Sequence, residues 1–234
     1  MKKIKFSDIK IEDIKEIVQL KEKGVEPSFW NNLIDTYGKP LTETEQLRIK
    51  MIQDDLMNYS IILMNEATIW ARAIYPILVM SEHMPIQAWA EIYLKAQYPQ
   101  FEVYGIVDGV LGNAVSGIVD TPFLTILEVK RGVEAKNPQA QLYGQLLAAA
   151  FLNYHADTKP DDTPDDQQEV FACYTVSDSW TFVHGIVDDL NSDKPRLTVQ
   201  YSREYSGKLE IETILQILKS IIQKQAAWIH AITS

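Results

Sequence analysis

The chain has 234 residues, enough for one domain with a good core, and its hydrophobic fraction of 46% and charged fraction of 23% are ordinary for a soluble globular protein. Its net charge of -10 excludes a protein that coats nucleic acid nonspecifically, because that role needs a basic surface, but leaves room for a local basic groove. No apolar run in the sequence approaches the roughly 18 residues of a membrane span.

The compartment is indicated by the N-terminus and by the cysteine content. The chain begins with MKKIKFSDIK, which is basic at first but has no apolar region, so the sequence predicts no signal peptide. Cys173 is the only cysteine, which excludes an internal disulfide and fits a reducing cytoplasm. Much of the acidic excess lies in residues 157–169, which we expect to form a solvated loop. We therefore expect a cytoplasmic protein without membrane contact.

Residues 1–41 are predicted to be an N-terminal accessory segment that precedes a single α/β domain over 42–234. Isoleucines between Ile9 and Ile17 are loosely spaced for an amphipathic helix from about Ser7 to Lys23. Glycines and prolines then interrupt the chain as far as Pro40.

A long helix is predicted to begin at Thr42. Glu45 lies three residues later, which is the spacing of a capping box. Apolar residues recur at helical spacing, and neither Gly nor Pro follows until Pro76. The helix either runs unbroken or bends near residues 58–60, and it ends around residues 80–83.

The middle of the chain alternates with a period of two, which predicts strands. The predicted strands are Ala88–Leu94, Phe101–Leu111 and Phe123–Lys130, with a loop over Gly112–Pro122. Pro138 marks the start of a predicted helix that continues to about His155. Three more strands follow at Glu169–Val176, Ser179–Val187 and Arg196–Arg203, and then an amphipathic helix over Glu210–Ile232. This order indicates an α+β or mixed α/β fold, and the sequence has neither a G-x-G-x-x-G nor a P-loop motif.

The strand Phe123–Lys130 carries an acid and a base at its end. Glu128 and Lys130 are two residues apart and therefore share a face, where burying them is costly unless they pair or hold a metal. An ion pair at a half-solvated strand end is the structural alternative. Asp108 lies in the preceding strand, although Asp108-Gly109 is also a common hairpin-turn pair. Two carboxylates on adjacent strands suit a hard cation such as Mg²⁺.

The following helix carries polar residues at helical spacing. Gln141 and Gln145 lie one turn apart, and Gln139 and Tyr143 have the same spacing on a neighbouring face. A glutamine on this helix can position a lysine, a water or the backbone. Either glutamine alone is also compatible with a polar helix face in solvent.

In this chain, Asp108 is followed about twenty residues later by Glu128-Val129-Lys130 and then by a predicted helix with glutamines. This pattern resembles the motif of the PD-(D/E)XK nuclease superfamily. Val107 stands where the motif's name has Pro. The resemblance implies a restriction-endonuclease-like core, in which a central mixed sheet is flanked by helices. It also implies a catalytic Lys130 and a metal site of Asp108, Glu128 and the Val129 carbonyl.

The resemblance extends to less fixed positions. It implies a further glutamate on the helix before the strands, for which Glu66 is the first candidate and Glu82 the second. It also implies a glutamine on the helix after them, for which Gln141 is the first candidate and Gln139 with Tyr143 the rival.

These features predict a DNA endonuclease that uses Mg²⁺ or Mn²⁺ to hydrolyse phosphodiester bonds. A homodimer, common in this superfamily, is compatible with the long apolar helix. The alternatives are a catalytically inactive nuclease-fold protein that acts as a binding or assembly module, which the acidic charge favours, and an unrelated α+β protein with a chance motif.

Overall fold

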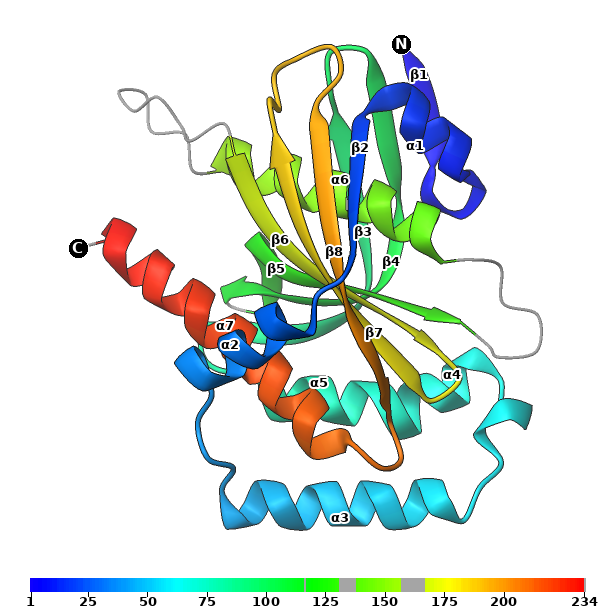
Figure 1. Cartoon of the computed structure of the whole chain (residues 1–234), viewed down its shortest axis with the longest axis vertical. Helices are drawn as coiled ribbons and strands as arrows, with labels where there is room; N and C mark the ends of the chain where they lie inside the picture. The colour runs from blue at the N-terminus through cyan, green and yellow to red at the C-terminus, as the bar shows by residue number, and fades with distance from the viewer. Residues whose placement is uncertain (116, 131–137, 157–166, 234) are drawn as a thin grey trace.

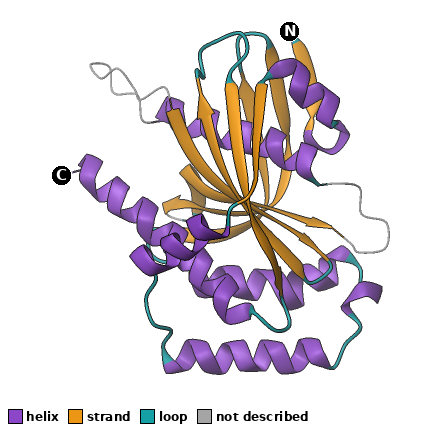
Figure 2. Ribbon diagram, viewed as in Figure 1, coloured by secondary structure: helices purple, strands orange, loops and turns teal. Residues whose placement is uncertain are grey.

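The computed structural model describes residues 1–115, 117–130, 138–156 and 167–233, which form a twisted mixed β-sheet between two layers of helices (Figure 1, Figure 2). The strands described are β1 Lys2–Lys5, β2 Gln19–Val25, β3 Ile86–Gln97, β4 Phe101–Val115, β5 Ile118–Lys130, β6 Gln167–Val176, β7 Ser179–Asp188 and β8 Arg196–Ser206. The α-helices described are α1 Ile11–Ile17, α2 Pro27–Tyr37, α3 Glu43–Met57, α4 Glu66–Ile69, α5 Tyr75–Ser81, α6 Gln139–Ala156 and α7 Ile211–Thr233. The expected mixed α/β class with a central mixed sheet is confirmed.

The sheet contains a fork, because β4 changes its neighbour along one of its edges. One edge of β4 pairs antiparallel with β3 over most of its length. The other edge pairs first with β1, in parallel over Phe101–Tyr104, and then with β5, antiparallel from Gly109 onward. Beyond β5 the order is β6, β7, β8 and β2, and the β5–β6 and β8–β2 pairs are parallel. On this edge of β4, residues 105–108 therefore separate the segment that pairs with β1 from the segment that pairs with β5.

Each face of the sheet has its own hydrophobic core. On one face, α6 and α1 pack with residues such as Phe6, Val107 and Leu146. On the other face, α2 to α5 and α7 pack with residues such as Trp30, Leu127 and Phe182. The alternation of side chains along each strand sends neighbouring residues into different cores. None of the helices in the described part of the chain combines the length and apolarity that crossing a bilayer would require.

The first 41 residues are part of the sheet. The helix predicted from Ser7 to Lys23 is wrong beyond Ile17, because α1 ends there and Gln19–Val25 forms β2. Most of β2 is exposed, so backbone pairing with β8 holds it in place, and no apolar alternation announces it in the sequence. Residues 1–41 thus contribute two strands, β1 and β2, to the main sheet.

Of the two alternatives after Thr42, the unbroken helix does not form, and the chain leaves the helix near residues 58–60. The helix α3 ends at Met57, where the side chain of Asn58 donates to the carbonyl of Asp54 at 2.8 Å. A new helical segment starts after Asn65, whose side-chain oxygen accepts from the amide of Thr68 at 2.8 Å. Local capping by two asparagines therefore overrides the apolar periodicity.

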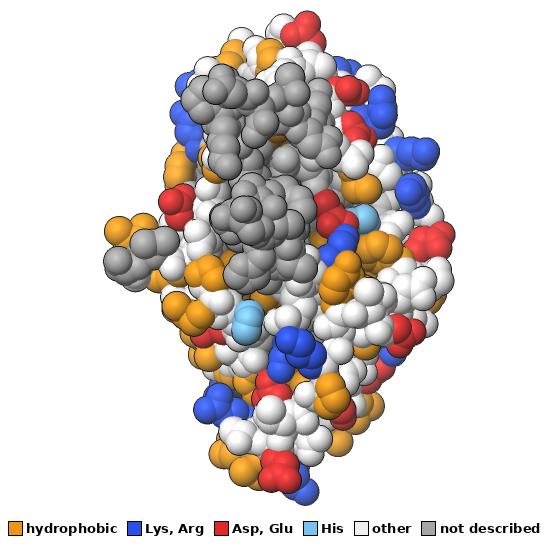
Figure 3. Space-filling model, turned by 90° about the vertical axis from the view of Figure 1, so that its left-hand side faces the viewer, with side chains coloured by type: hydrophobic (Ala, Val, Ile, Leu, Met, Phe, Trp, Pro, Cys, Tyr) orange, Lys and Arg blue, Asp and Glu red, His pale blue; other side chains and the backbone are white. Residues whose placement is uncertain are grey.

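Two further predictions concern the segment before β5 and the acidic stretch. The expected loop over Gly112–Pro122 is wrong, because β4 runs to Val115 and β5 begins at Ile118. Most of the acidic stretch, residues 157–166, lies outside the described residues. On the face in Figure 3, the visible basic side chains are interspersed with acidic ones.

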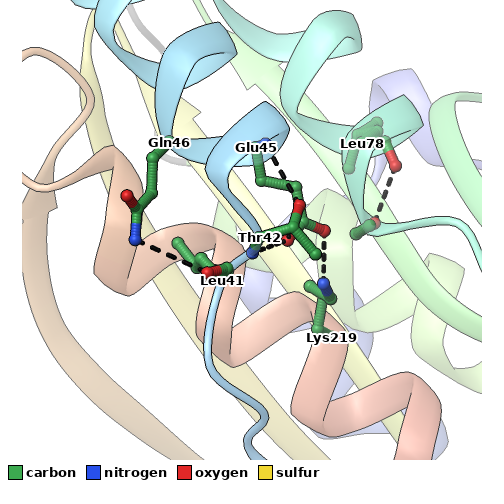
Figure 4. Close-up of polar contacts among 7 residues, drawn as sticks. Leu41, Thr42, Glu45, Gln46, Leu78 and Lys219 are labelled. Atoms are coloured by element: carbon green, nitrogen blue, oxygen red, sulfur yellow. Dashed lines mark hydrogen bonds and ion pairs between the residues drawn. The ribbon is translucent and has the colours of Figure 1, made fainter.

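The start of α3 is tied to α7 by a capping box that includes a lysine (Figure 4). The amide of Thr42 donates to Glu45 Oε2 at 2.7 Å, the amide of Glu45 donates to Thr42 Oγ1 at 3.2 Å, and Lys219 of α7 forms an ion pair with Glu45. We expect Thr42→Ala to lower the free energy of unfolding by about 1 kcal/mol in denaturant titrations, because it leaves a helix amide without its acceptor. Glu43→Ala, which removes an exposed first-turn acid outside the cap, is the control, and equal losses in both would contradict the capping role.

Candidate active site

Asp108 lies at the fork between β4 and β5. The last regular pair between these strands at this end is Gly109 with Leu127. Beyond this pair, the amide of Val129 donates to Asp108 Oδ2 at 2.7 Å. The Asp108 carboxylate thus accepts the hydrogen bond that a backbone carbonyl of β4 would accept in a regular antiparallel pair. Asp108 is half-buried within β4, which excludes the alternative of a hairpin-turn aspartate.

Gly109 allows this arrangement by its lack of a side chain. A Cβ at this position would lie 2.5 Å from Cη2 of Trp70, far inside van der Waals contact. Trp70 belongs to the π-helical segment Trp70–Ile74 that links α4 to α5. The helical layer therefore packs directly on the strand next to Asp108.

Glu128 is a fully buried carboxylate in the middle of the site. Its neighbours Leu127 and Val129 face the core under α5 and α7, so Glu128 faces the other way, toward α6. There the side-chain amide of Gln145 donates to Glu128 Oε2 at 2.7 Å. Lys130 forms an ion pair with Glu128 Oε1, and its own side chain is 21% exposed. The site is thus closed toward the core and open at Lys130.

The proton affinities of these groups reflect burial and mutual repulsion. Burial raises the pKa of Glu128 to about 7, with a further contribution from the charge of Asp108, and the attraction of Lys130 only partly offsets them. Burial also raises the pKa of Asp108, against the hydrogen bond from Val129. Burial lowers the pKa of Lys130, but Glu128, Asp108 and Glu66 together raise it more, so it is raised overall. Lys130 therefore stays charged, while the two carboxylates resist being ionised together.

Of the two glutamates proposed on the preceding helices, Glu66 has the better position. Glu66 is the first residue of α4, is exposed, and its charge raises the pKa of both Asp108 and Lys130. Glu82 is engaged elsewhere, because its Oε1 accepts from the amide of Ala88 at 2.9 Å. Glu91 in β3 also raises the pKa of Asp108, and it has a positive φ of 54°. Glu91 was not among the expected site residues, since nothing in the sequence signals that irregularity of the strand.

The glutamine that contacts the carboxylate is Gln145, one turn after the first candidate, Gln141. Both lie on the same side of α6, and Gln141 is half-buried. In the rival pair of Gln139 and Tyr143, the tyrosine has other partners. Its hydroxyl lies 2.5 Å from Glu22 Oε1 and also contacts Tyr201. Two residues along a helix correspond to a rotation of about 200°, which turns Tyr143 away from Gln145. The contact with Glu128 is thus made by Gln145, while the role expected of Gln141 stays a prediction.

The described residues include no group of three or more His, Cys, Asp and Glu side chains that is placed to hold a metal ion. Asp108 and Glu128 provide two acidic side chains. The Oε1 atom of Gln145 is buried and lacks a hydrogen-bond partner within the described ranges, which leaves an acceptor beside Glu128. A cavity of about 550 Å³ lies elsewhere, near the start of β5 and β6, and its lining includes Pro122, Glu169 and Lys224.

No family model and no curated protein matches this chain.

Proposed function

We propose that the protein is a metal-dependent DNA endonuclease of the PD-(D/E)XK type with a restriction-endonuclease-like core. The observation that carries the proposal is the buried Glu128 carboxylate, held by Gln145 and Lys130 beside Asp108. The order of elements supports it, because helical segments precede the antiparallel strands β3 to β5, and α6 then leads to β6, parallel to β5. An ordinary ion pair at a strand end would not need a second carboxylate and a buried amide.

The donor set fits a hard divalent cation, Mg²⁺ or Mn²⁺. Asp108 and Glu128 would hold it through carboxylate oxygens, and the main-chain carbonyl of Val129 would be the third donor. The charge of Asp108 adds to burial in raising the pKa of Glu128, and a cation between the two carboxylates would relieve this repulsion. When bound, the cation would polarise a phosphoryl oxygen and lower the pKa of a water molecule.

The protein's own groups have separate tasks in this proposal. Lys130 keeps its positive charge and reaches solvent, so its ammonium group can stabilise charge that develops on the phosphate. Gln145 fixes the orientation of Glu128 and leaves its Oε1 to accept a hydrogen bond from a water molecule. Glu66, at the exposed rim, adds a negative charge near Asp108.

The test is a calorimetric titration of Mn²⁺ and Mg²⁺ into the wild type and into Asp108→Ala and Glu128→Ala. A pH near 8 is required, because Glu128 holds its proton below a pKa of about 7. We expect one site that both substitutions remove, and metal-dependent cleavage when the wild type is incubated with supercoiled, linear duplex and single-stranded DNA. Metal binding without cleavage of any of these would identify an inactive nuclease-fold module. Binding unchanged by either substitution, with or without DNA, would overturn the metal site.

A further inference from the structure

One face of the sheet next to the fork carries lysines, the exposed Tyr93 and the half-buried Tyr104. Tyr93 in β3 pairs with Ile106 in β4, and Tyr104 in β4 pairs with Lys95 on one side and Lys5 on the other. Cross-strand partners share a face. The tyrosine–lysine face, as we name it, consists of Lys3, Lys5, Tyr93, Lys95, Tyr104 and Ile106.

This face is open to solvent. The intervening residues Leu94, Val103 and Val107 belong to the core under α6, so the tyrosine–lysine face is on the opposite side. Tyr93, on the edge strand β3, is 58% exposed, and its cross-strand partner Ile106 on β4 is 56% exposed.

The charge of the face is positive although the protein as a whole carries -10. Two of its three lysines share one carboxylate, since Lys95 pairs with Glu102 at 2.8 Å and Lys3 lies 3.7 Å from it. Lys5 is exposed beside Tyr104 in the register of β1 and β4. The face therefore combines flat aromatic surface with surplus positive charge.

The face ends at the fork, on the side of the sheet opposite to α6. Ile106 lies two residues before Asp108 on β4, about 7 Å along the strand. Between them the strand turns over, because Val107 belongs to the core under α6 whereas Gly109 faces Trp70 in the opposite layer. Glu128 is turned toward α6, so a chain lying across the tyrosines would reach the fork from the side opposite to that carboxylate.

We propose that the tyrosine–lysine face binds a single-stranded segment of nucleic acid and leads it to the fork at Asp108 and Glu128. Unpaired bases expose their ring faces for stacking on tyrosine, whereas the bases of a duplex are stacked on each other. Lysines along the same path neutralise phosphates. A second copy of the chain fits less well, because a two-fold contact through this face would bring lysines of both copies together. The inference rests on the proposed nuclease function and adds the form of its substrate.

The test is the fluorescence anisotropy of a labelled oligothymidine and of a duplex of equal length, in Mg²⁺, with all proteins carrying Lys130→Met so that the strand is not cut. We expect tighter binding of the single strand, and a loss of about 10- to 100-fold in its affinity with Tyr93→Ala. Tyr93→Phe, which keeps the ring, should retain the affinity. Lys5→Ala should reduce the slope of log affinity against log salt by about 0.7. Leu209→Ala, which removes an apolar side chain that is 70% exposed outside this face, is the control.

The outcomes separate this inference from the nuclease proposal. If the wild type cleaves DNA but Tyr93→Ala binds the single strand normally, the tyrosine–lysine face is not the binding surface and the nuclease proposal stands. If the wild type neither cleaves nor binds any DNA form, both fail. If sedimentation shows that Tyr93→Ala instead dissociates a dimer without changing DNA affinity, the face is a contact between copies, which overturns the inference.

Discussion

DNA cleavage by Lys130→Met is expected to be about 10²- to 10³-fold slower than cleavage by the wild type at saturating Mg²⁺ and DNA. The substitution keeps the aliphatic stem but removes the ammonium group paired with Glu128, and losing a single preorganised charge donor has an effect of this size. The rate should be measured in single-turnover assays at pH 8. Metal binding should survive, because the lysine contributes no oxygen ligand.

The matched control for this substitution is Lys219→Met. Lys130 and Lys219 are both 21% exposed and both form an ion pair with a glutamate, but Lys219 pairs with Glu45 at the start of α3. Both variants should lose some stability in thermal melts, and only Lys130→Met should lose cleavage. Equal cleavage by the two would remove Lys130 from the chemistry.

The same assay decides between the two glutamines of α6. Gln145→Leu should weaken metal binding by about 10- to 100-fold, because Glu128 loses the amide that orients it. It should also move the pH dependence of cleavage to higher pH, since the hydrogen bond from Gln145 lowers the pKa of Glu128. A merely structural role would not shift that profile. Gln141→Leu should leave both quantities unchanged, and the opposite result would restore Gln141 as the positioning residue.

The second large effect is a loss of stability between pH 5 and pH 8 that depends on Glu128. Burial raises its pKa in the folded protein to about 7 from an ordinary value of 4.5. Between these values the folded protein keeps a proton that the unfolded chain has released, so the free energy of unfolding falls as pH rises. The expected loss is about 2 to 3 kcal/mol over this interval.

Asp108 contributes with the same sign as Glu128, because burial raises its pKa too, whereas several other groups act in different pH ranges or with the opposite sign. Glu45 and Glu169 have lowered pKa values, so their contribution is lost only as pH falls below about 4.5. Burial lowers the pKa of His155, which makes stability rise with pH near neutrality. The Glu128→Gln variant retains all of these groups. Its difference from the wild type in urea titrations at pH 5 and pH 8 therefore isolates Glu128, and a difference that does not change with pH would mean that Glu128 remains ionised beside Lys130 throughout.

The sequence was informative where local chemistry decides structure. The apolar run before Glu128 predicts β5, because a buried strand needs apolar residues on both faces, and Glu128 with Lys130 share a face by strand periodicity alone. Thr42 with Glu45 predicts the start of α3, since both partners of a capping box lie within one turn. Asp108, Glu128 and Lys130 could therefore be grouped from their strand positions and spacing alone.

Other features depend on partners that are distant in the chain. Strands β1 and β2 form because their backbones pair with β4 and β8, and mostly exposed residues such as those of β2 carry no periodic signal of such pairing. Gln145 rather than Gln141 reaches Glu128 because of the position of α6 relative to β5, which helical spacing alone leaves open by one turn. The sequence by itself determined the mixed α/β class and the acid and base at the end of β5. Only the tertiary structure decided that β4 changes partners at Asp108, because strand register is set by non-local pairing and packing.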